Sequence, residues 1–405
     1  MQVTVADIED ARDRLDDESV VRETPIETNR SLAAETRAEV RLKMEHLQRT
    51  GSFKTRGAYN KLTQVAASDS DATRAVAASA GNHAQGVALA ATKVGLEATI
   101  VMPRGAPQAK IDATEGYGAE VVLHGADFQA AMAHAKTLVD DDSVFVHAYD
   151  DPDIVAGQGT LGLELVEQVP DADTVVVPIG GGGLIGGIAT AVAARSPETR
   201  IVGVQAESAA TVPESLDKGG PVTIDSMQTI ADGIATGGIS ELTYELIDAY
   251  VDEVVTVTDT EIAESVLFLL ERTKQMVEGA GAASVAAVRS DRLDVSDEIV
   301  VPLLCGGNLS MTDLQTVLTH GLTHRNQLVH LQVHIVDRPG EMSRVSELIA
   351  DSGANIHDVE HERSAKELDV GDAYLQFHVQ TSGTGQTERI LESLRNADYD
   401  VELLN

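Results

Sequence analysis

The sequence has almost no cysteine, few basic residues and no long hydrophobic run. Cys305 is the only cysteine in 405 residues, so no disulfide can form within the chain, which fits a reducing cytoplasm. No apolar stretch approaches the roughly 20 residues that cross a bilayer, and the N-terminus lacks the basic start and apolar core of a signal peptide. These absences predict a soluble, cytoplasmic protein without a membrane partner.

Positive charge is also scarce. Lysine and arginine total 30 against 65 acidic residues, which gives a net charge of −35, and only nine of the 30 are lysines. Such a surface repels nucleic acid and anionic membranes, so we exclude both as main partners. The acidic residues are spread along the whole chain, and an evenly acidic, lysine-poor surface resembles that of cytosolic proteins from extreme halophiles, where dense counterions screen the repulsion.

Short apolar runs alternate with alanine-rich segments of helical period. Continuous β-branched runs are typical of strands that are covered on both faces. Such runs occur at 75–79, 98–102, 120–123, 174–178, 201–205 and 299–304. Helices are predicted between them, for example at 83–93, 127–139, 184–194 and 260–274. The alternation predicts α/β layers with mostly parallel sheets.

The pattern changes near residue 325, where strict alternation of apolar and polar residues begins. Residues 328–336 and 372–380 alternate in this way and predict strands with one buried face. Further strands at 354–362 and 399–404 and helices at 342–349 and 385–396 complete a β-α-β-β-α-β order. The polar segment 323–327 is the predicted junction between a first domain of residues 1–322 and a second of residues 328–405.

The first segment with chemical meaning is 50–58, which holds Lys54. A lysine flanked by Phe53 and small residues can lie in a crowded, partly dry pocket. Burial lowers the pKa of the amine and makes it available as a nucleophile or as a Schiff-base amine. The alternative is a solvated surface lysine, which is the fate of most lysines.

The second segment is 79–86, which follows a predicted buried strand and opens a helix. Free backbone N–H groups at a helix N-terminus suit a carboxylate or phosphate, and Asn82 adds a side-chain amide. The alternative is an ordinary capped turn with Ser79 or Asn82 as the cap. His83 has no second ligand at a suitable spacing, so no metal site is expected.

The third segment is the glycine run Gly180–Gly183, between a predicted strand and a helix. Residues without a Cβ atom allow several N–H groups to converge on one phosphate. The run also satisfies the dinucleotide fingerprint, with Glu207 near the expected ribose position, so a nicotinamide oxidoreductase is an alternative. That alternative explains neither Lys54 nor the 79–86 segment.

Taken together, the segments fit a ligand with an aldehyde and a phosphate, together with an amino-acid carboxylate. The order SFK (52–54), SAGNH (79–83), GGGGL (180–184) and CGGN (305–308) resembles the threonine dehydratase family of fold-type II pyridoxal-phosphate enzymes, over about residues 5–318. The resemblance implies two doubly wound α/β subdomains with pyridoxal 5'-phosphate between them in the first domain. It also implies that L-threonine is converted to 2-oxobutyrate and ammonia.

The resemblance assigns roles to individual residues. Lys54 would hold the cofactor as a Schiff base and remove the α-proton, with Phe53 beside the ring and Asn82 at its 3-oxygen. The phosphate would be bound by Gly180, Gly181, Gly182, Gly183 and Leu184. The substrate carboxylate would be bound by Ser79, Ala80, Gly81, Asn82 and His83. Gly233 would pass close to the cofactor, and Cys305 would lie beside the ring nitrogen, where a neutral thiol leaves the ring largely unprotonated.

Two residues distinguish among the enzymes that the chain resembles. Thr55 stands where threonine and cysteine synthases usually carry an acid, which favours dehydratases and racemases. Ala80 stands where racemases place a serine, so efficient racemisation is not expected. A serine-preferring dehydratase remains an alternative because it needs the same groups, and a catalytically dead amino-acid sensor is disfavoured by the intact Lys54 and Asn82.

The tail at 328–405 resembles an ACT domain, on the strength of residues 336–345 and 352–356. The resemblance implies effector binding by Asp337, Gly340 and Asn355 at a dimer interface; the alternative is a dimerisation unit without an effector. A branched-chain amino acid is the expected effector, first of all isoleucine, because 2-oxobutyrate feeds its synthesis. The expected assembly is a homo-oligomer, either a dimer or a tetramer, under allosteric control.

Overall fold

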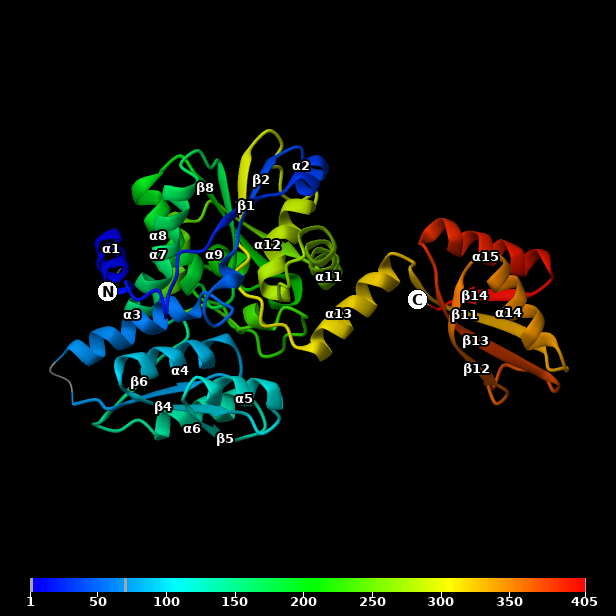
Figure 1. Cartoon of the computed structure of the whole chain (residues 1–405), viewed down its shortest axis with the longest axis horizontal. Coiled ribbons are helices and arrows are strands. Elements are labelled where there is room, and N and C mark those ends of the chain that lie inside the picture. Colours follow the sequence, from blue (N-terminus) through cyan, green and yellow to red (C-terminus); the bar gives the residue numbers. More distant parts are fainter. Residues whose placement is uncertain (1–2, 69–70, 405) are drawn as a thin grey trace. The chain divides into compact units, whose positions relative to one another are not determined.

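The computed structural model describes residues 3–68 and 71–404 (Figure 1). The chain divides into two compact units, Met1–Ser310 and Met311–Asn405. Helix α13 (Met311–His324) opens the second unit, so the first two residues of the predicted 323–327 junction are helical. The chain therefore divides twelve residues upstream of the start of that predicted junction.

The N-terminal unit contains a six-stranded sheet in the order β1-β2-β10-β7-β8-β9. Its strands are β1 (Ile26–Thr28), β2 (Glu39–Lys43), β7 (Thr174–Pro178), β8 (Arg200–Ala206), β9 (Glu253–Val257) and β10 (Ile299–Pro302). All neighbours are parallel except β1 and β2. The central strand β7 is buried at every position, as a continuous apolar run with both faces covered requires.

A second sheet of the same unit has the order β5-β4-β3-β6 and is parallel throughout. Its strands are β3 (Arg74–Ala78), β4 (Glu97–Met102), β5 (Glu120–Leu123) and β6 (Ser143–Phe145). All six predicted strands of the first domain are present in the two sheets. The prediction missed β1, β2, β6 and β9, which are short or carry polar residues.

Helices cover both sheets. They are α1 (Val5–Arg14), α2 (Arg30–Thr36), α3 (Lys54–Ala67), α4 (Asn82–Val94), α5 (Gln108–Gly116), α6 (Phe128–Thr137), α7 (Pro152–Gln168), α8 (Gly183–Arg195), α9 (Val212–Lys218), α10 (Glu241–Tyr250), α11 (Asp259–Phe268) and α12 (Gly279–Arg289). A π-helical turn at Leu269–Thr273 extends α11, in agreement with the predicted helix at 260–274. Helix α8 is buried from Gly183 to Val192, because it is apolar on every side and is therefore covered on every side.

The C-terminal unit has the predicted β-α-β-β-α-β order. Its elements after α13 are β11 (Leu328–Val336), α14 (Glu341–Asp351), β12 (Asn355–Glu362), β13 (Asp372–Gln380), α15 (Thr384–Asn396) and β14 (Asp400–Leu403). The four strands form an antiparallel sheet in the order β12-β13-β11-β14. The apolar positions of β11 and β13 pack with Val345, Ile349, Ile390 and Leu394 of the helices, so the alternating pattern buries one face of the sheet.

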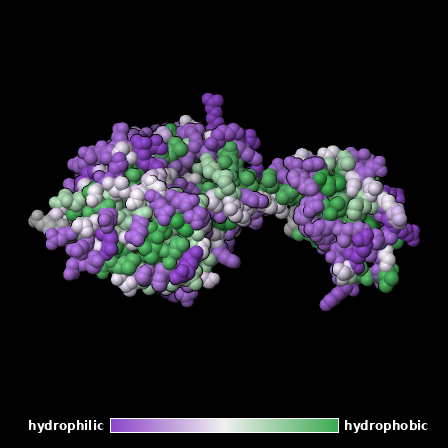
Figure 2. Space-filling view, turned by 60° about the horizontal axis from the view of Figure 1, so that its bottom comes forward, coloured by the Kyte–Doolittle hydropathy of each residue, from purple (hydrophilic) through white to green (hydrophobic). Residues whose placement is uncertain are grey.

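Figure 2 shows hydrophilic residues over much of the visible face of each unit, with hydrophobic patches between them. Among residues 3–68 and 71–404, no helix is both long enough and apolar enough to span a bilayer.

Candidate active site

Lys54 is the first residue of α3, and Phe53 directly precedes the helix. The amine of Lys54 donates a hydrogen bond to the backbone oxygen of Ala148 at 3.1 Å and lies 5.0 Å from the centre of the Phe53 ring. Burial lowers the pKa of the amine to about 8, although the neighbouring Cys305 and Glu278 act in the opposite direction. A sizeable fraction of Lys54 is therefore neutral at slightly alkaline pH.

Parallel strands place the loops that follow them at one edge of each sheet. In the larger sheet, β7 and β10 are parallel neighbours, so Gly180–Gly183 and the segment from Cys305 emerge together. In the smaller sheet, β3 pairs with β6 in parallel, so residues 79–83 and 146–149 emerge together. The topology thus gathers segments that lie far apart in the sequence.

The 79–83 loop leads from β3 into α4. Gly81 is the N-cap residue of α4, and no side chain caps the helix, so the expected alternative of a cap by Ser79 or Asn82 does not occur. The Ser79 hydroxyl instead accepts a hydrogen bond from the Gly81 N–H at 3.1 Å. The first backbone N–H groups of α4 are therefore not satisfied by a capping side chain, which suits binding of a carboxylate.

The ring of His83 lies on the inner side of this loop. Its Nε2 atom is 2.9 Å from the backbone oxygen of Val146, and the side chain is buried. Burial, together with the nearby charge of Lys54, lowers the pKa of the ring to about 3. The imidazole is therefore neutral and is held by the protein itself.

The glycine run between β7 and α8 has no room for side chains. A methyl group on Gly181 would lie 2.2 Å from Cδ1 of Tyr149, and one on Gly182, whose φ is +87°, would lie 2.8 Å from Cβ of Thr243. The Thr243 hydroxyl donates to the Gly181 backbone oxygen at 2.8 Å and fixes the turn. No side chain caps α8, so the helix start that includes Leu184 can bind an anion.

Contacts join the lysine to the segment after β10. The Phe53 N–H donates to the backbone oxygen of Cys305 at 3.2 Å, and the Glu278 N–H donates to that of Gly306 at 3.1 Å. Burial strongly raises the pKa of the Cys305 thiol, so the group remains neutral.

Further contacts connect these residues to the glycine run. A Cβ on Gly233 would lie 3.5 Å from Oε1 of Glu278, and a Cβ on Gly180 would lie 3.4 Å from the Gly233 oxygen. On the opposite side, Tyr149 packs against Gly181 and follows Ala148, the partner of Lys54. Six of the residues predicted for the cofactor therefore belong to one closed circuit of contacts: Phe53, Lys54, Gly180, Gly181, Gly233 and Cys305.

Sequence analysis missed Glu278 and the segment around Tyr149, and it gave no role to Asn308, which it named only as the end of the CGGN motif. Burial raises the pKa of the Glu278 carboxyl to about 7. The available signals were the run of small residues that follows Glu278 and the CGGN motif that ends in Asn308. Tyr149 carries no signal of its own.

Beside the site, Arg56 forms a buried ion-pair network. Its guanidinium group contacts Glu45 and Glu164, each at 2.6 Å, and Glu164 also pairs with Lys43 at 2.8 Å. Arg56, Glu45 and Lys43 are almost inaccessible to solvent. The network balances two positive against two negative charges and anchors the first turn of α3.

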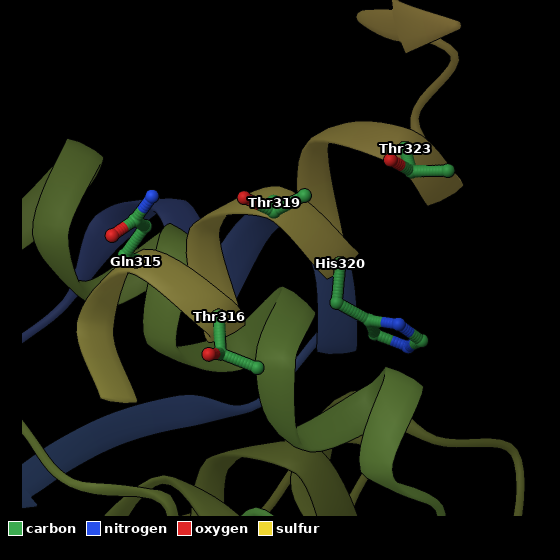
Figure 3. Close-up of a pocket in the computed structure, with 5 residues that line it drawn as sticks. All are labelled: Gln315, Thr316, Thr319, His320 and Thr323. Carbon is green, nitrogen blue, oxygen red and sulfur yellow. The ribbon is translucent and has the colours of Figure 1, made fainter. Parts of the chain in front are cut away.

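A separate hollow lies along α13 in the C-terminal unit. It is lined by Gln315, Thr316, Thr319, His320 and Thr323 (Figure 3). These residues include no lysine, no carboxylate and no glycine run, so we do not assign the cofactor to this hollow.

The predicted effector residues of the C-terminal unit do not meet within one chain. Asp337 follows β11 and pairs with Arg363 at 2.7 Å and with His361 at 3.4 Å, and Gly340 opens α14 with a φ of +100°. Asn355 begins β12 at the opposite end of the sheet, in register with Gln380 and Leu328. Eight residue steps along β11 separate these ends by about 26 Å.

The residues present fit pyridoxal phosphate. A half-buried lysine amine of lowered pKa suits its aldehyde, and a glycine run without room for side chains suits its phosphate. Two α/β sheets with such a site at their strand ends define an enzyme that uses a phosphorylated aldehyde cofactor.

Comparison with known proteins identifies the family. A family profile described as "Pyridoxal-phosphate dependent enzyme" matches residues 18–306, and an ACT-domain profile matches residues 323–400. The chain belongs to the pyridoxal-phosphate-dependent enzyme family and carries a C-terminal ACT domain. This confirms the predicted fold class, cofactor and tail domain, and it favours the lysine-and-phosphate interpretation over the dinucleotide alternative.

Individual relatives are similar over most of the chain. The L-threonine ammonia-lyase of Thermotoga maritima is 43% identical over 404 residues, which cover 99% of this chain and 100% of that protein. The processed form of threonine deaminase isoform 2 from Solanum lycopersicum has a TM-score of 0.73 at 35% identity, with 78% of this chain and 86% of that chain covered. Maize serine racemase has a TM-score of 0.73 at 32% identity, with 80% and 100% covered.

Proposed function

We propose that this protein is a threonine ammonia-lyase, which eliminates water from L-threonine and releases 2-oxobutyrate and ammonia. The observation that carries the proposal is the circuit of contacts joining the Lys54 amine to the glycine run, in a chain 43% identical to an L-threonine ammonia-lyase over almost its full length.

Lys54 performs the proton chemistry in this proposal. When bound, pyridoxal phosphate supplies an aldehyde for amino groups and an electron-withdrawing ring that stabilises negative charge at the substrate α-carbon. With a pKa of about 8, the Lys54 amine is available as a nucleophile and as a base for the α-proton. Phe53, beside the amine, limits its access to water.

The remaining residues bind and orient. The N–H groups of Gly180–Gly183 and the start of α8 hold the phosphate, with Leu184 in the first helical turn and Gly233 against the glycine run. The loop that leads into α4 presents N–H groups to the substrate carboxylate; it consists of Ser79, Ala80, Gly81, Asn82 and His83. The buried, neutral thiol of Cys305 would supply no negative charge to keep a proton on the cofactor's ring nitrogen, and a largely unprotonated ring would suit loss of a β-hydroxyl group.

Absorbance and product assays test this function. We would purify the protein in molar-range KCl, record its visible spectrum, and assay 2-oxobutyrate from L-threonine in parallel with pyruvate from L-serine. The expected result is a yellow protein that favours threonine, with both colour and activity lost in Lys54→Ala. Faster turnover of serine would identify a serine dehydratase instead, and a colourless protein inert to both amino acids would overturn the assignment.

We further propose that the tail senses a branched-chain amino acid, with isoleucine as the first candidate, and that the enzyme supplies 2-oxobutyrate for isoleucine synthesis in a salt-rich cytoplasm. The separation of Asp337 from Asn355 supports a site shared between two copies of the chain, and therefore a homo-oligomer, either a dimer or a tetramer. Isothermal titration with isoleucine, valine and leucine, together with analytical ultracentrifugation, tests this. A monomer that binds none of the three would contradict it.

A further inference from the structure

Two asparagines and one glutamate form a hydrogen-bonded chain in the cofactor site. Asn308 Nδ2 donates to the backbone oxygen of Thr50 at 2.6 Å and to Oδ1 of Asn82 at 2.8 Å. Asn82 Nδ2 donates in turn to Oε1 of Glu278 at 2.7 Å. All three residues are half-buried. If one of them were removed, water could therefore satisfy the hydrogen bonds of the other two only in part.

The chain of bonds fixes which way each amide points. A backbone carbonyl can only accept, so the atom of Asn308 that faces Thr50 must be its nitrogen. The same nitrogen faces Asn82, so the Asn82 atom at this contact must be the oxygen. The Asn82 nitrogen is therefore turned toward Glu278, whose carboxylate accepts one of its two hydrogens and leaves the other for a ligand.

The position of Glu278 is itself fixed from several sides. Glu278 immediately precedes α12, where the helix dipole favours a carboxylate. Its carboxylate also accepts a hydrogen bond from the backbone of Asn308. It occupies the space left by Gly306, where a Cβ atom would lie 2.1 Å from Oε1. A carboxylate held in this way is a rigid acceptor for the Asn82 amide.

We propose that Glu278 is a positioning residue, which holds the Asn82 amide with its nitrogen toward the cofactor and so makes Asn82 a hydrogen-bond donor to it. This inference rests on the proposed function and on the role that the resemblance implies for Asn82, at the 3-oxygen of pyridoxal phosphate. Removing the carboxylate leaves the Asn82 nitrogen without its fixed partner, so only the contact with Asn308 still orients the amide and Asn82 is held less firmly. Glu278 acts through Asn82 and not on the substrate.

A double-mutant cycle on cofactor affinity tests the inference. Pyridoxal phosphate is titrated into cofactor-free wild type, Asn82→Ala, Glu278→Ala and the double variant, and its dissociation constant and absorption maximum are read from the visible spectrum. We expect each single variant to weaken binding about tenfold, as for the loss of one hydrogen bond, and to shift the absorption maximum in the same direction. The double variant should bind no more weakly than Asn82→Ala, because the two residues act as one unit.

Rescue by a conservative variant separates positioning from general support of the fold. Glu278→Gln keeps an acceptor oxygen of the same reach, so it should restore the affinity to within about threefold of wild type. The inference is overturned if the two single effects multiply to about a hundredfold in the double variant, or if Glu278→Gln binds as weakly as Glu278→Ala. A wild type that takes up no cofactor would instead overturn the proposed function, so the two failures are distinct.

If Glu278→Ala does not fold, Asn308→Ala tests the same chain from its other end. This variant removes the partner of the Asn82 oxygen. If the double variant Asn308→Ala/Asn82→Ala binds pyridoxal phosphate no more weakly than Asn82→Ala, the inference of an oriented amide is supported. If the two losses of affinity multiply in the double variant, the inference is overturned.

Discussion

Replacing Lys54 with methionine should stabilise the cofactor-free protein, and the variant should no longer purify as a yellow protein. Burial lowers the pKa of the Lys54 amine from 10.5 to about 8, so the folded state penalises the ammonium form. Each pKa unit corresponds to about 1.4 kcal/mol, so the shift amounts to roughly 3 kcal/mol in a dry site. Water reaches this half-buried side chain, and screening reduces the expected gain in Lys54→Met to about 2 kcal/mol at neutral pH.

The extra free energy of unfolding of Lys54→Met should decrease as the pH rises above about 8. Between about pH 8 and pH 10.5 the unfolded chain binds a proton at Lys54 that the folded chain has lost, so wild-type stability rises with pH in this window. Below about pH 8 both states hold the proton, and the penalty is complete. The stability difference between Lys54→Met and wild type should therefore be constant at lower pH and disappear near pH 10.5.

Urea denaturation of the cofactor-free full chain, followed by circular dichroism in molar-range KCl, measures this difference. Lys218→Met is the matched control, because Lys218 is an exposed lysine that pairs with Glu214 one helical turn away. Its loss should change the free energy of unfolding by less than about 0.5 kcal/mol. The reasoning is refuted if Lys54→Met is no more stable than this control, or if its advantage persists unchanged at high pH.

Three further predictions concern the phosphate loop, the buried charges and the surface. In Gly181→Ala the added methyl group would lie 2.2 Å from the Tyr149 ring, so cofactor affinity in a spectroscopic titration should fall at least about tenfold; unchanged affinity would argue against this loop as the phosphate site. Arg56→Met should lower the urea-derived stability by about 3–5 kcal/mol, because the buried Glu45 then loses its ion-pair partner and Glu164 keeps only Lys43. The control is Arg12→Met, which removes an exposed ion pair with Glu167 and should lower the free energy of unfolding by less than about 1 kcal/mol. Equal losses of stability in the two variants would show that burial of the Arg56 network is unimportant. Raising KCl from about 0.1 to 1 M shortens the Debye length from about 10 to 3 Å and should raise the melting temperature of this chain of charge −35; melting independent of salt would contradict the halophilic interpretation.

The sequence predicted elements best where the hydrophobic period is uninterrupted. The run at 174–178 and the alternating segments at 328–336 and 372–380 have the bounds of β7, β11 and β13. Strand β2 escaped prediction because Arg41 and Lys43 interrupt its apolar pattern, and Lys43 is nevertheless buried through its pairing with Glu164. The burial of Lys43 depends on Glu164, which lies 121 residues further along the chain. A local sequence pattern does not contain this information.

The site shows the same division between local and distant information. The sequence could predict roles for Lys54, Asn82 and Gly180–Gly183 because each lies in a distinctive segment at the start of a helix. Glu278 was not found, because an isolated glutamate in an acidic chain gains meaning only from Asn82, 196 residues away. In so acidic a protein, a candidate functional acid is therefore recognised by its burial and its partners and not by composition.

Burial has opposite effects on the two charged groups of the site, and this links chemistry to stability. It lowers the pKa of Lys54 to about 8 and raises that of Glu278 to about 7, so both titrate near neutral pH. Each group therefore strains the cofactor-free fold in its charged form, as expected where function requires a reactive amine. A cofactor that consumes the Lys54 amine would remove the buried ammonium group and so relieve the strain at Lys54. Because the cofactor binds only the folded chain, a cofactor concentration of a hundred times its dissociation constant should add about 2.7 kcal/mol to the free energy of unfolding. The cofactor-free enzyme lacks this contribution, so its stability should be the more sensitive to low salt.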